Sequence, residues 1–264
     1  MSVLDLFSLE GEVALVTGGT HGLGMAVATA LAEAGATLVI NGHSADRLEK
    51  ALEIYRDKGV EAKGYLFDVT DERQVAESVA RIENEVGPVG ILVNNAGIIK
   101  RIPALEMTLP EWNDVIATDL TAPFLMSRAV AAGMIRRGRG KIVNMCSMMS
   151  EVGRNSVTAY AAAKGGLKML TKNLATEWAS HNIQVNGIGP GYFATEQTAP
   201  IRVDGHPFND FIIGRTPASR WGDPEDLGGT AVFLASRASD FVNGHILYVD
   251  GGILASLGRA ANEY

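Results

Sequence analysis

The sequence predicts an α/β protein with a parallel, doubly wound sheet of seven strands flanked by helices. Two observations lead to this prediction. Short runs rich in Val, Ile and Leu alternate with amphipathic stretches of helical length along the whole chain. The short runs are also nearly continuous in apolar residues, as expected for strands that are covered on both faces. No linker, low-complexity segment or internal repeat divides the sequence, so we expect a single domain over residues 1–264.

Each expected strand is followed by enough residues for a crossover connection, and helical patterns fill most of these intervals. Two long helices are expected near 110–136 and 157–181, and capping boxes mark helix starts at TLPE (108–111) and at Asp223 in GDPEDL. Ligands of such sheets bind outside the carboxyl ends of the strands, so functional residues are expected there. The expected strands are VALVT (13–17), TLVIN (37–41), AKGYLF (62–67), GILVN (90–94), KIVNM (141–145), IQVNGI (183–188) and HILYVD (245–250).

Composition excludes several classes of partner. The net charge of −7 argues against nucleic acid and anionic membranes, and the densest basic run, MIRRGRGK (134–141), is interpreted as a solvated loop. The single cysteine, Cys146, permits no intrachain disulfide and is expected at a buried strand end. The first twelve residues lack a basic leader, and no apolar run is expected to span a bilayer. These features predict a cytoplasmic protein.

The first strand leads into a glycine-rich turn and then a helix, VALVTGGTHGLGMAVATALAEAG. Gly18, Gly22 and Gly24 lack side chains where the backbone must turn tightly and approach a pyrophosphate at a helix N-terminus. No Lys–Ser/Thr pair follows, so the turn is not a Walker loop. The context predicts a Rossmann-type dinucleotide site, with a purely structural glycine turn as the alternative.

The end of the second strand bears on the choice between NADP and NAD. An acidic residue there would hold a ribose 2′-hydroxyl and repel a 2′-phosphate, but INGHSADRL has no acid before Asp46. His21, His43, Ser44 and Arg47 are available as phosphate donors, although each is by default a surface residue. NADP is therefore the expected cofactor, and NAD remains possible.

The third and fourth strands end in FDVT and VNNAG. Asp68 is expected to accept hydrogen bonds from an adenine amino group and a backbone amide. Asn94, Asn95, Ala96 and Gly97 offer small side chains and backbone amides beside a nucleoside. Polar turn chemistry would explain the same residues equally well.

The heptapeptide TAYAAAK (158–164) places Tyr160 and Lys164 four positions apart, one helical turn from each other. Taken alone, the pair is most simply a surface tyrosine beside a snorkelling lysine. However, the fifth strand ends near Ser147, thirteen residues before Tyr160, at the sheet edge where ligands bind. These three side chains are candidates for moving a proton.

Together, TGGTHGLG, NNAG, Ser147 with AYAAAK, and GPGYFAT (189–195) resemble the short-chain dehydrogenase/reductase family over essentially the full chain. The resemblance implies that Tyr160 exchanges a proton with the substrate hydroxyl during hydride transfer. A phenol has a reference pKa near ~10, and nearby positive charge favours its phenolate form. Lys164 would supply that charge and bind the nicotinamide ribose, and Ser147 would orient the substrate oxygen.

One position departs from the family pattern. The family has an asparagine that supports a water leading protons to the lysine, and the matching residue here is Asp119. An ionised Asp accepts hydrogen bonds but cannot donate them. Either the relay tolerates the change, which we favour, or the protein is a catalytically silent NADP-binding sensor or scaffold.

Two arginines are candidates for binding an acidic substrate. Arg101 follows NNAG and Arg154 follows Ser147, and a guanidinium suits capture of a carboxylate, although either is alternatively a surface ion pair. Glu151 either contacts sugar hydroxyls or faces solvent. FSLEG, AGIIKRIP, CSMMSE and HPFNDFII are similar to family members that interconvert D-gluconate and 5-keto-D-gluconate. The alternative is a dehydrogenase of another sugar acid, such as a 2-deoxy-ketogluconate, or of a neutral polyol.

The resemblance also implies a homotetramer or homodimer, and the substrate region is expected around 192–220. No metal site is expected, because the acidic residues are scattered and give no ligand constellation. The expected catalytic residues are Ser147, Tyr160, Lys164 and Asp119. The expected substrate contacts are Arg101, Ser147, Met148, Arg154, Tyr160 and Tyr192. The expected cofactor contacts are Gly18, Thr20, His21, Gly22, Leu23, Gly24, His43, Ser44, Asp68, Val69, Asn95, Ala96, Gly97, Tyr160, Lys164, Pro190, Gly191 and Thr195.

Overall fold

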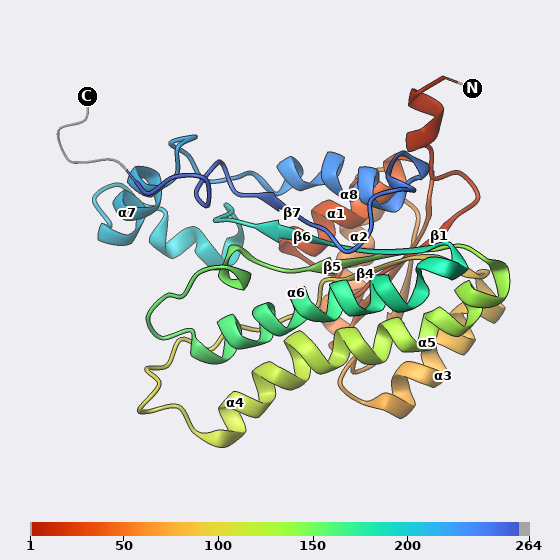
Figure 1. The fold of residues 1–264 in the computed structure, drawn as a ribbon, viewed down its shortest axis with the longest axis horizontal. Coiled ribbons are helices and arrows are strands. Elements are labelled where there is room, and N and C mark those ends of the chain that lie inside the picture. The colour runs from red at the N-terminus through yellow and green to blue at the C-terminus, as the bar shows by residue number, and fades with distance from the viewer. Residues whose placement is uncertain (1, 259–264) are drawn as a thin grey trace.

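The computed structural model describes residues 2–258, in which seven parallel strands form one sheet in the order β3-β2-β1-β4-β5-β6-β7 (Figure 1). The chain starts in the middle at β1, moves outward to β3, and returns to β4 on the other side of β1. This reversal creates the topological switch point at which dinucleotides bind. The predicted fold is confirmed, and the strands are Val13–Val16, Thr37–Gly42, Ala62–Leu66, Val89–Asn94, Gly140–Met145, Ile183–Pro190 and Ile246–Val249.

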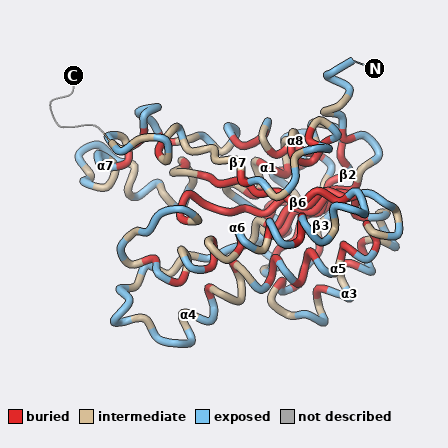
Figure 2. Tube along the Cα trace, in the orientation of Figure 1, coloured by how far each residue is buried: buried red, intermediate tan, exposed pale blue. Residues whose placement is uncertain are grey.

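Helices cover both faces of the sheet, as Figure 1 shows, with α1 and α8 on one side and α3, α5 and α6 on the other. α1 (Gly22–Glu33), α2 (Ala45–Asp57) and α8 (Gly228–Ala235) bury their apolar residues in one core cluster. α3 (Glu72–Glu85), α5 (Ala122–Arg137) and the C-terminal part of α6 (Thr158–Trp178) bury theirs in a second. The central strands between these layers are buried along their length (Figure 2), which explains their continuous apolar sequence.

The first predicted long helix is interrupted. α4 (Leu109–Ile116) begins with the predicted capping box at Thr108 and Glu111, and a π-helical turn over Ala117–Thr121 joins it to α5. Within residues 2–258, the helical stretch Leu109–Arg137 alone is long and apolar enough to cross a membrane, contrary to our expectation. Half of its apolar window is nevertheless buried inside the protein, as in a core helix.

The interpretation of residues 134–141 as a solvated loop is wrong for most of the segment. Met134 and Arg137 belong to the last turn of α5, and Lys141 lies in β5, with only two residues between these elements. Arg137 donates to the carbonyl of Val89 at 2.7 Å, and Lys141 pairs with Asp240 at 2.8 Å. These partners lie far away in the sequence, so the basic run by itself did not reveal them.

The segment between β6 and α8 lies beyond the carboxyl end of the sheet. It contains the 3-10 helix Glu196–Ile201 and α7 (Pro207–Arg215), and the predicted box at Asp223 begins a further 3-10 turn, Pro224–Leu227. The described residues contain four other short 3-10 helices, at Leu4–Phe7, Met148–Ser150, Ala179–His181 and Arg237–Ser239.

Candidate active site

The glycine-rich turn after β1 is shaped for close approach of another group. Gly18 and Gly22 have positive φ of 62° and 56°. A Cβ on Gly24 would lie 2.3 Å from Asn95 Nδ2 and 2.4 Å from the carbonyl oxygen of Gly18, so only glycine fits there. His21, the residue before α1, makes no side-chain cap to the helix, so the first N–H groups of α1 have no partner in the His21 side chain.

The next turn, after β2, lies beside the glycine turn. A Cβ on Gly42 would lie 2.9 Å from Thr20 Cγ2, and Thr20 Oγ1 lies 3.0 Å from His21 Nδ1. His43 is exposed, and Ser44 precedes α2 without capping it. The structure therefore brings together the four donors Thr20, His21, His43 and Ser44 around the two turns.

Asp68 follows β3 and is exposed. Its Oδ1 accepts hydrogen bonds from Thr70 N at 2.8 Å and from Thr70 Oγ1 at 2.7 Å, which is the polar turn chemistry that we considered as the alternative. Val69, its neighbour, is buried with 8% exposure. The second carboxylate oxygen of Asp68 is left for other contacts.

The NNAG stretch at the end of β4 ties the glycine turn to the centre of the site. Asn95 Nδ2 donates to the carbonyls of Thr17 and Gly18 at 3.0 Å each, and Ala96 N donates to Thr17 Oγ1 at 3.1 Å. Asn94 points inward instead and donates to Asn144 Oδ1 at 2.8 Å. Its predicted place beside a nucleoside is therefore not supported by its side chain, which braces β4 against β5.

Tyr160 and Lys164 lie in the first two turns of α6, and Lys164 is 4% exposed. Its Nζ donates to the carbonyl of Met145 at 2.9 Å and lies 5.5 Å from the centre of the Tyr160 ring. A snorkelling lysine would place its ammonium in water, so the surface interpretation of this pair is wrong.

Asp119 completes the surroundings of Lys164. The carboxylate is fully buried on the π-helical turn; its Oδ1 accepts from Ile98 N at 2.8 Å and its Oδ2 lies 3.1 Å from Lys164 Nζ. A Cβ on Gly97 would approach Oδ2 to 2.8 Å, so the glycine of NNAG leaves room for this carboxylate. Burial is the largest single influence and would lower the pKa of Lys164, but the charge of Asp119, together with the interactions with Tyr160 and Cys146, outweighs burial and raises that pKa.

Ser147 follows β5 and is 7% exposed. Its Oγ accepts from Met149 N at 3.1 Å, and Ser150 Oγ donates to the carbonyl of Lys164 at 2.9 Å. Met148, Tyr160 and Tyr192 pack in a common apolar cluster. The turn after β5, the start of α6 and the segment after β6 therefore meet in one place.

The loop after β6 faces the glycine turn. Gly191 lies against Asp250, where a Cβ would approach the Asp250 Cα to 2.8 Å, and Thr195 is the nearest side chain to the position of a Cβ on Gly22, at 3.9 Å. Pro190 ends β6 and is buried. Thr195, predicted to contact the nicotinamide end of the cofactor, therefore lies beside the glycine turn predicted to contact its pyrophosphate.

The two candidate arginines differ in their surroundings. Arg154 donates from Nη1 to the Tyr192 hydroxyl at 3.2 Å and lies 4.3 Å from the centre of the Phe208 ring on α7. Arg101 is exposed, on the loop between β4 and α4. Arg154 is therefore linked to the residues around Tyr160, whereas Arg101 lies at the outer edge.

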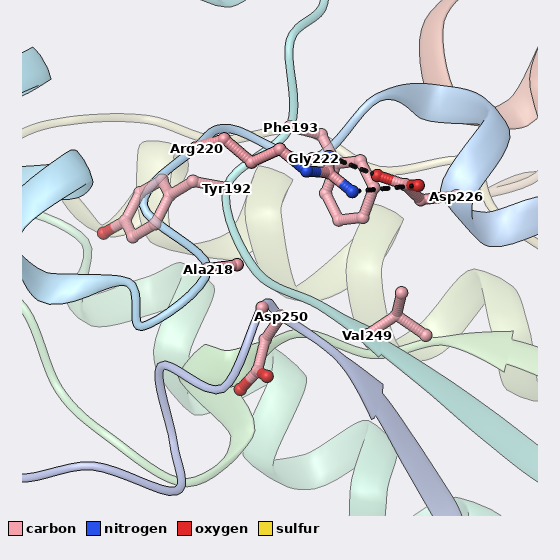
Figure 3. A pocket seen from close by; sticks show the side chains of 9 residues that line it. Tyr192, Phe193, Ala218, Arg220, Gly222, Asp226, Val249 and Asp250 are labelled. Atoms are coloured by element: carbon pink, nitrogen blue, oxygen red, sulfur yellow. Dashed lines mark hydrogen bonds and ion pairs between the residues drawn. The ribbon is translucent and has the colours of Figure 1, made fainter.

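A cavity of about 240 Å³ lies beside Tyr192, as Figure 3 shows. The Arg220–Asp226 ion pair, with contacts of 2.6 and 3.2 Å, closes one side, and Asp250 lies on another. Among residues 2–258, no group of three or more His, Cys, Asp or Glu side chains is arranged to hold a metal ion.

Sequence analysis did not identify the backbone groups that fix the buried pair. Ile98 N and the Met145 carbonyl hold Asp119 and Lys164, yet any residue type can present a backbone group. The only available signals were their positions just after β4 and at the end of β5.

A doubly wound sheet with a glycine turn, a Tyr–Lys pair and a serine at its carboxyl edge defines a dinucleotide-dependent oxidoreductase class. The family profile described as "Enoyl-(Acyl carrier protein) reductase" matches residues 18–254. The chain belongs to the short-chain dehydrogenase/reductase family.

Three relatives illustrate the similarity. A 2-dehydro-3-deoxy-D-gluconate 5-dehydrogenase of Formosa agariphila is 64% identical over 264 residues, covering 100% of both chains. A 5-keto-D-gluconate 5-reductase of Escherichia coli is 51% identical, covering 96% of this chain and 99% of the relative. A crystal structure of a gluconate 5-dehydrogenase from Burkholderia cenocepacia in complex with NADP and tartrate has a TM-score of 0.92 and 44% identity, covering 97% of this chain and 100% of that chain.

Proposed function

We propose that this protein is an NADP(H)-dependent oxidoreductase that interconverts an alcohol of a sugar acid and its ketone, with D-gluconate and 5-keto-D-gluconate as the first candidate pair. The observation that carries the proposal is the buried Lys164 ammonium, 5.5 Å from the centre of the Tyr160 ring. A buried ion pair such as Lys164–Asp119 still costs desolvation free energy and adds little stability, so its presence beside a tyrosine at this sheet edge is best explained by a role in catalysis.

In this mechanism Tyr160 removes the proton from the substrate hydroxyl and returns it in the reverse direction. Lys164 lies beside Tyr160, where its positive charge stabilises negative charge that develops on the phenol oxygen as the proton moves. Ser147 Oγ already accepts from Met149 N, which leaves the O–H of Ser147 free to donate to the substrate oxygen. The Met145 carbonyl and Asp119 hold Lys164 in place during these steps.

The residues of the glycine turn fit a dinucleotide, because Gly18, Gly22 and Gly24 leave backbone N–H groups and space at the start of α1. We assign the ribose phosphate to His21, His43 and Ser44 and therefore favour NADP over NAD. When bound, the nicotinamide accepts or returns the hydride. The remaining cofactor contacts are assigned to Thr20, Leu23, Asp68, Val69, Asn95, Ala96, Gly97, Lys164, Pro190, Gly191 and Thr195.

A second substrate is favoured by the Formosa agariphila relative, which is 64% identical and named for 2-dehydro-3-deoxy-D-gluconate. Both substrates are six-carbon acids with a carboxylate at C1 and oxidation at C5. They differ at C2 and C3. We assign the carboxylate to Arg154, with Arg101 as the second candidate, and the rest of the pocket to Met148, Tyr192 and the region 192–220.

The alternative of a catalytically silent sensor rested on Asp119. Its carboxylate supports Lys164 rather than displacing it, which favours an active enzyme.

We further propose a cytoplasmic homotetramer or homodimer formed by one domain spanning 1–264. Phe124 on α5 and Met169 on α6 are exposed apolar side chains (38% and 52%) on the two helices assigned to the interface.

The test is a cofactor-absorbance assay on the purified protein. NADP and NAD are crossed with D-gluconate, 2-dehydro-3-deoxy-D-gluconate and a neutral polyol such as sorbitol, with 5-keto-D-gluconate and NADPH for the reverse direction. We expect NADP-dependent turnover of at least one sugar acid and little turnover of sorbitol. No turnover of any acid with either cofactor would overturn the proposal.

A further inference from the structure

Glu151 lies in a cluster that joins three segments of the candidate active site. Its Oε1 accepts a hydrogen bond from the Tyr248 hydroxyl at 2.6 Å and lies 2.5 Å from Lys168 Nζ. Glu151 directly follows the 3-10 turn Met148–Ser150, while Lys168 lies on α6 and Tyr248 on β7. Glu151 is exposed to solvent, as one of the two expectations had it, and its carboxylate also makes these two contacts.

Tyr248 is itself fixed in place. It lies opposite Gly189 of β6 in the sheet register, and a Cβ on Gly189 would approach the Tyr248 ring to 2.2 Å. The ring also packs against the apolar cluster that contains Cys146 and Leu167. Gly189 is two residues before Gly191, so Tyr248 links Glu151 to the strand end that leads into the nicotinamide side of the site.

The turn that carries Ser147 is thereby held at two points. Ser150 Oγ donates to the carbonyl of Lys164 at 2.9 Å, one turn before Lys168. At the other point, Glu151 binds Lys168 and Tyr248. The hydrogen bond from Lys168 and then that from Tyr248 lower the pKa of Glu151, so its carboxylate is ionised at neutral pH.

The partial exposure of this cluster limits its contribution to global stability. The side chains of Glu151 and Lys168 are 36% and 23% exposed, and solvent screens ion pairs of this kind. We therefore expect the cluster to affect the position of the Ser147 turn more than the stability of the protein. Small displacements of a group in an active site reduce the rate strongly.

We infer that Glu151 is a positioning residue, which holds the Ser147 turn against α6 and β7 and so sets the separation of Ser147 and Tyr160. This inference rests on the proposed function, in which both residues act on one substrate oxygen. Glu151 does not contact the substrate. Its carboxylate acts on the Ser147 turn through its contacts with Lys168 and Tyr248.

The test compares Glu151→Ala, Glu151→Gln and Tyr248→Phe with wild type. Glu151→Ala removes both contacts, and we expect kcat to fall about tenfold, less than the ~10²-fold that a 1 Å misplacement can cause. The KM for the sugar acid and the Kd for NADPH should change less than about twofold. Glu151→Gln still accepts from Tyr248 and should recover most of the lost kcat, while Tyr248→Phe should lie between the two.

Glu77→Gln is the matched control, because it removes a similar ion pair, Glu77 with Arg73 at 3.2 Å on α3. It should leave kcat unchanged. Hydrogen exchange of residues 147–153 gives a readout that does not require turnover, and Glu151→Ala should exchange faster there than wild type. If the wild-type protein oxidises no sugar acid, the proposed function is rejected. The hydrogen-exchange measurement still tests whether Glu151 positions the Ser147 turn.

Three results would overturn the inference. The first is a raised KM with unchanged kcat in Glu151→Ala, which would place Glu151 in the substrate pocket. The second is unchanged hydrogen exchange in residues 147–153. The third is a loss of kcat that only follows a lowered Tm and appears equally in Glu77→Gln.

Discussion

The carboxylate of Asp119 and the ammonium of Lys164 form an ion pair of 3.1 Å that is almost completely buried. Each Asp119 oxygen faces a donor, since Oδ1 accepts from Ile98 N and Oδ2 faces Lys164. Among the described residues, Oδ2 has no partner besides Lys164. This arrangement suits a carboxylate and not an amide.

Asp119→Asn should therefore impair the enzyme, although asparagine is the residue of the family pattern. The amide NH₂ would have to face either the Ile98 N–H or Lys164, and Lys164 would remain buried without its counter-charge. Removing one partner of a buried pair costs about 3–5 kcal/mol of unfolding free energy. We expect kcat to fall at least tenfold and Tm to fall, measured by the cofactor-absorbance assay and calorimetry. Turnover in the variant alone would support the silent-sensor alternative.

The same variant should shift the pH dependence. Asp119 raises the pKa of Lys164, so the stability that this pairing adds is present at neutral pH and is lost as the pH rises through the raised value. Without Asp119 the ammonium loses its proton at lower pH. The alkaline limb of the pH–rate profile should therefore move to lower pH in Asp119→Asn. An unchanged alkaline limb would show that Lys164 does not control it.

The central strands were predictable because each is a local apolar run with both faces covered, whereas the edge strands β3 and β7 are partly exposed. The π-helical turn at Ala117–Thr121 was not predicted, although Pro123 in the first turn of α5 is a local signal for it, because proline has no N–H with which to continue the α-helical hydrogen bonds. Arg137 and Lys141 show the same limit. Their charge is visible in the sequence, but the Val89 carbonyl and Asp240 that bind them come from distant segments.

The site was predictable where its chemistry follows a spacing, as in Tyr160 and Lys164 or in the glycine turn. The site was not predictable where the contacts of a side chain depend on segments that are distant in the sequence. Glu151 carries no local signal that it binds Lys168 and Tyr248. Asn94 likewise shares its motif with Asn95 but turns inward, because Asn144 on the neighbouring strand offers it a partner.

Tyr160→Phe should abolish oxidation of the sugar acid and leave the cofactor bound. The change removes the proton acceptor, and general base catalysis contributes about 10²–10⁴-fold. We expect a loss of kcat of that size with the Kd of NADPH, measured by fluorescence, within about twofold of wild type. Tyr65→Phe is the control, because its hydroxyl binds Glu85 on α3 at 2.7 Å, away from the site. Substantial turnover in Tyr160→Phe would remove this tyrosine from its role.

Gly24→Ala should weaken cofactor binding. The added Cβ would lie 2.3 Å from Asn95 Nδ2 and 2.4 Å from the Gly18 carbonyl, so the turn must shift, and overpacking of this kind costs about 1–3 kcal/mol. We expect the Kd of NADPH to rise at least tenfold. Gly229→Ala on α8 is the matched control, because its Cβ would meet nothing within 4 Å. Equal effects of the two changes would exclude the glycine turn as the binding element.

Arg154→Ala should separate acidic from neutral substrates. The guanidinium donates to the Tyr192 hydroxyl at 3.2 Å and stacks on Phe208, which leaves further N–H groups to bind a carboxylate beside the Tyr160 cluster. Hydrogen bonds to charged groups contribute about 1.5–3 kcal/mol, so the KM for D-gluconate should rise about 10- to 100-fold. The KM for a neutral polyol should change little.

Arg101→Ala, measured alongside, should have the smaller effect because Arg101 is exposed. If Arg101→Ala produces the larger selective rise, the carboxylate contact belongs to Arg101, and equal losses for acids and polyols would exclude both arginines.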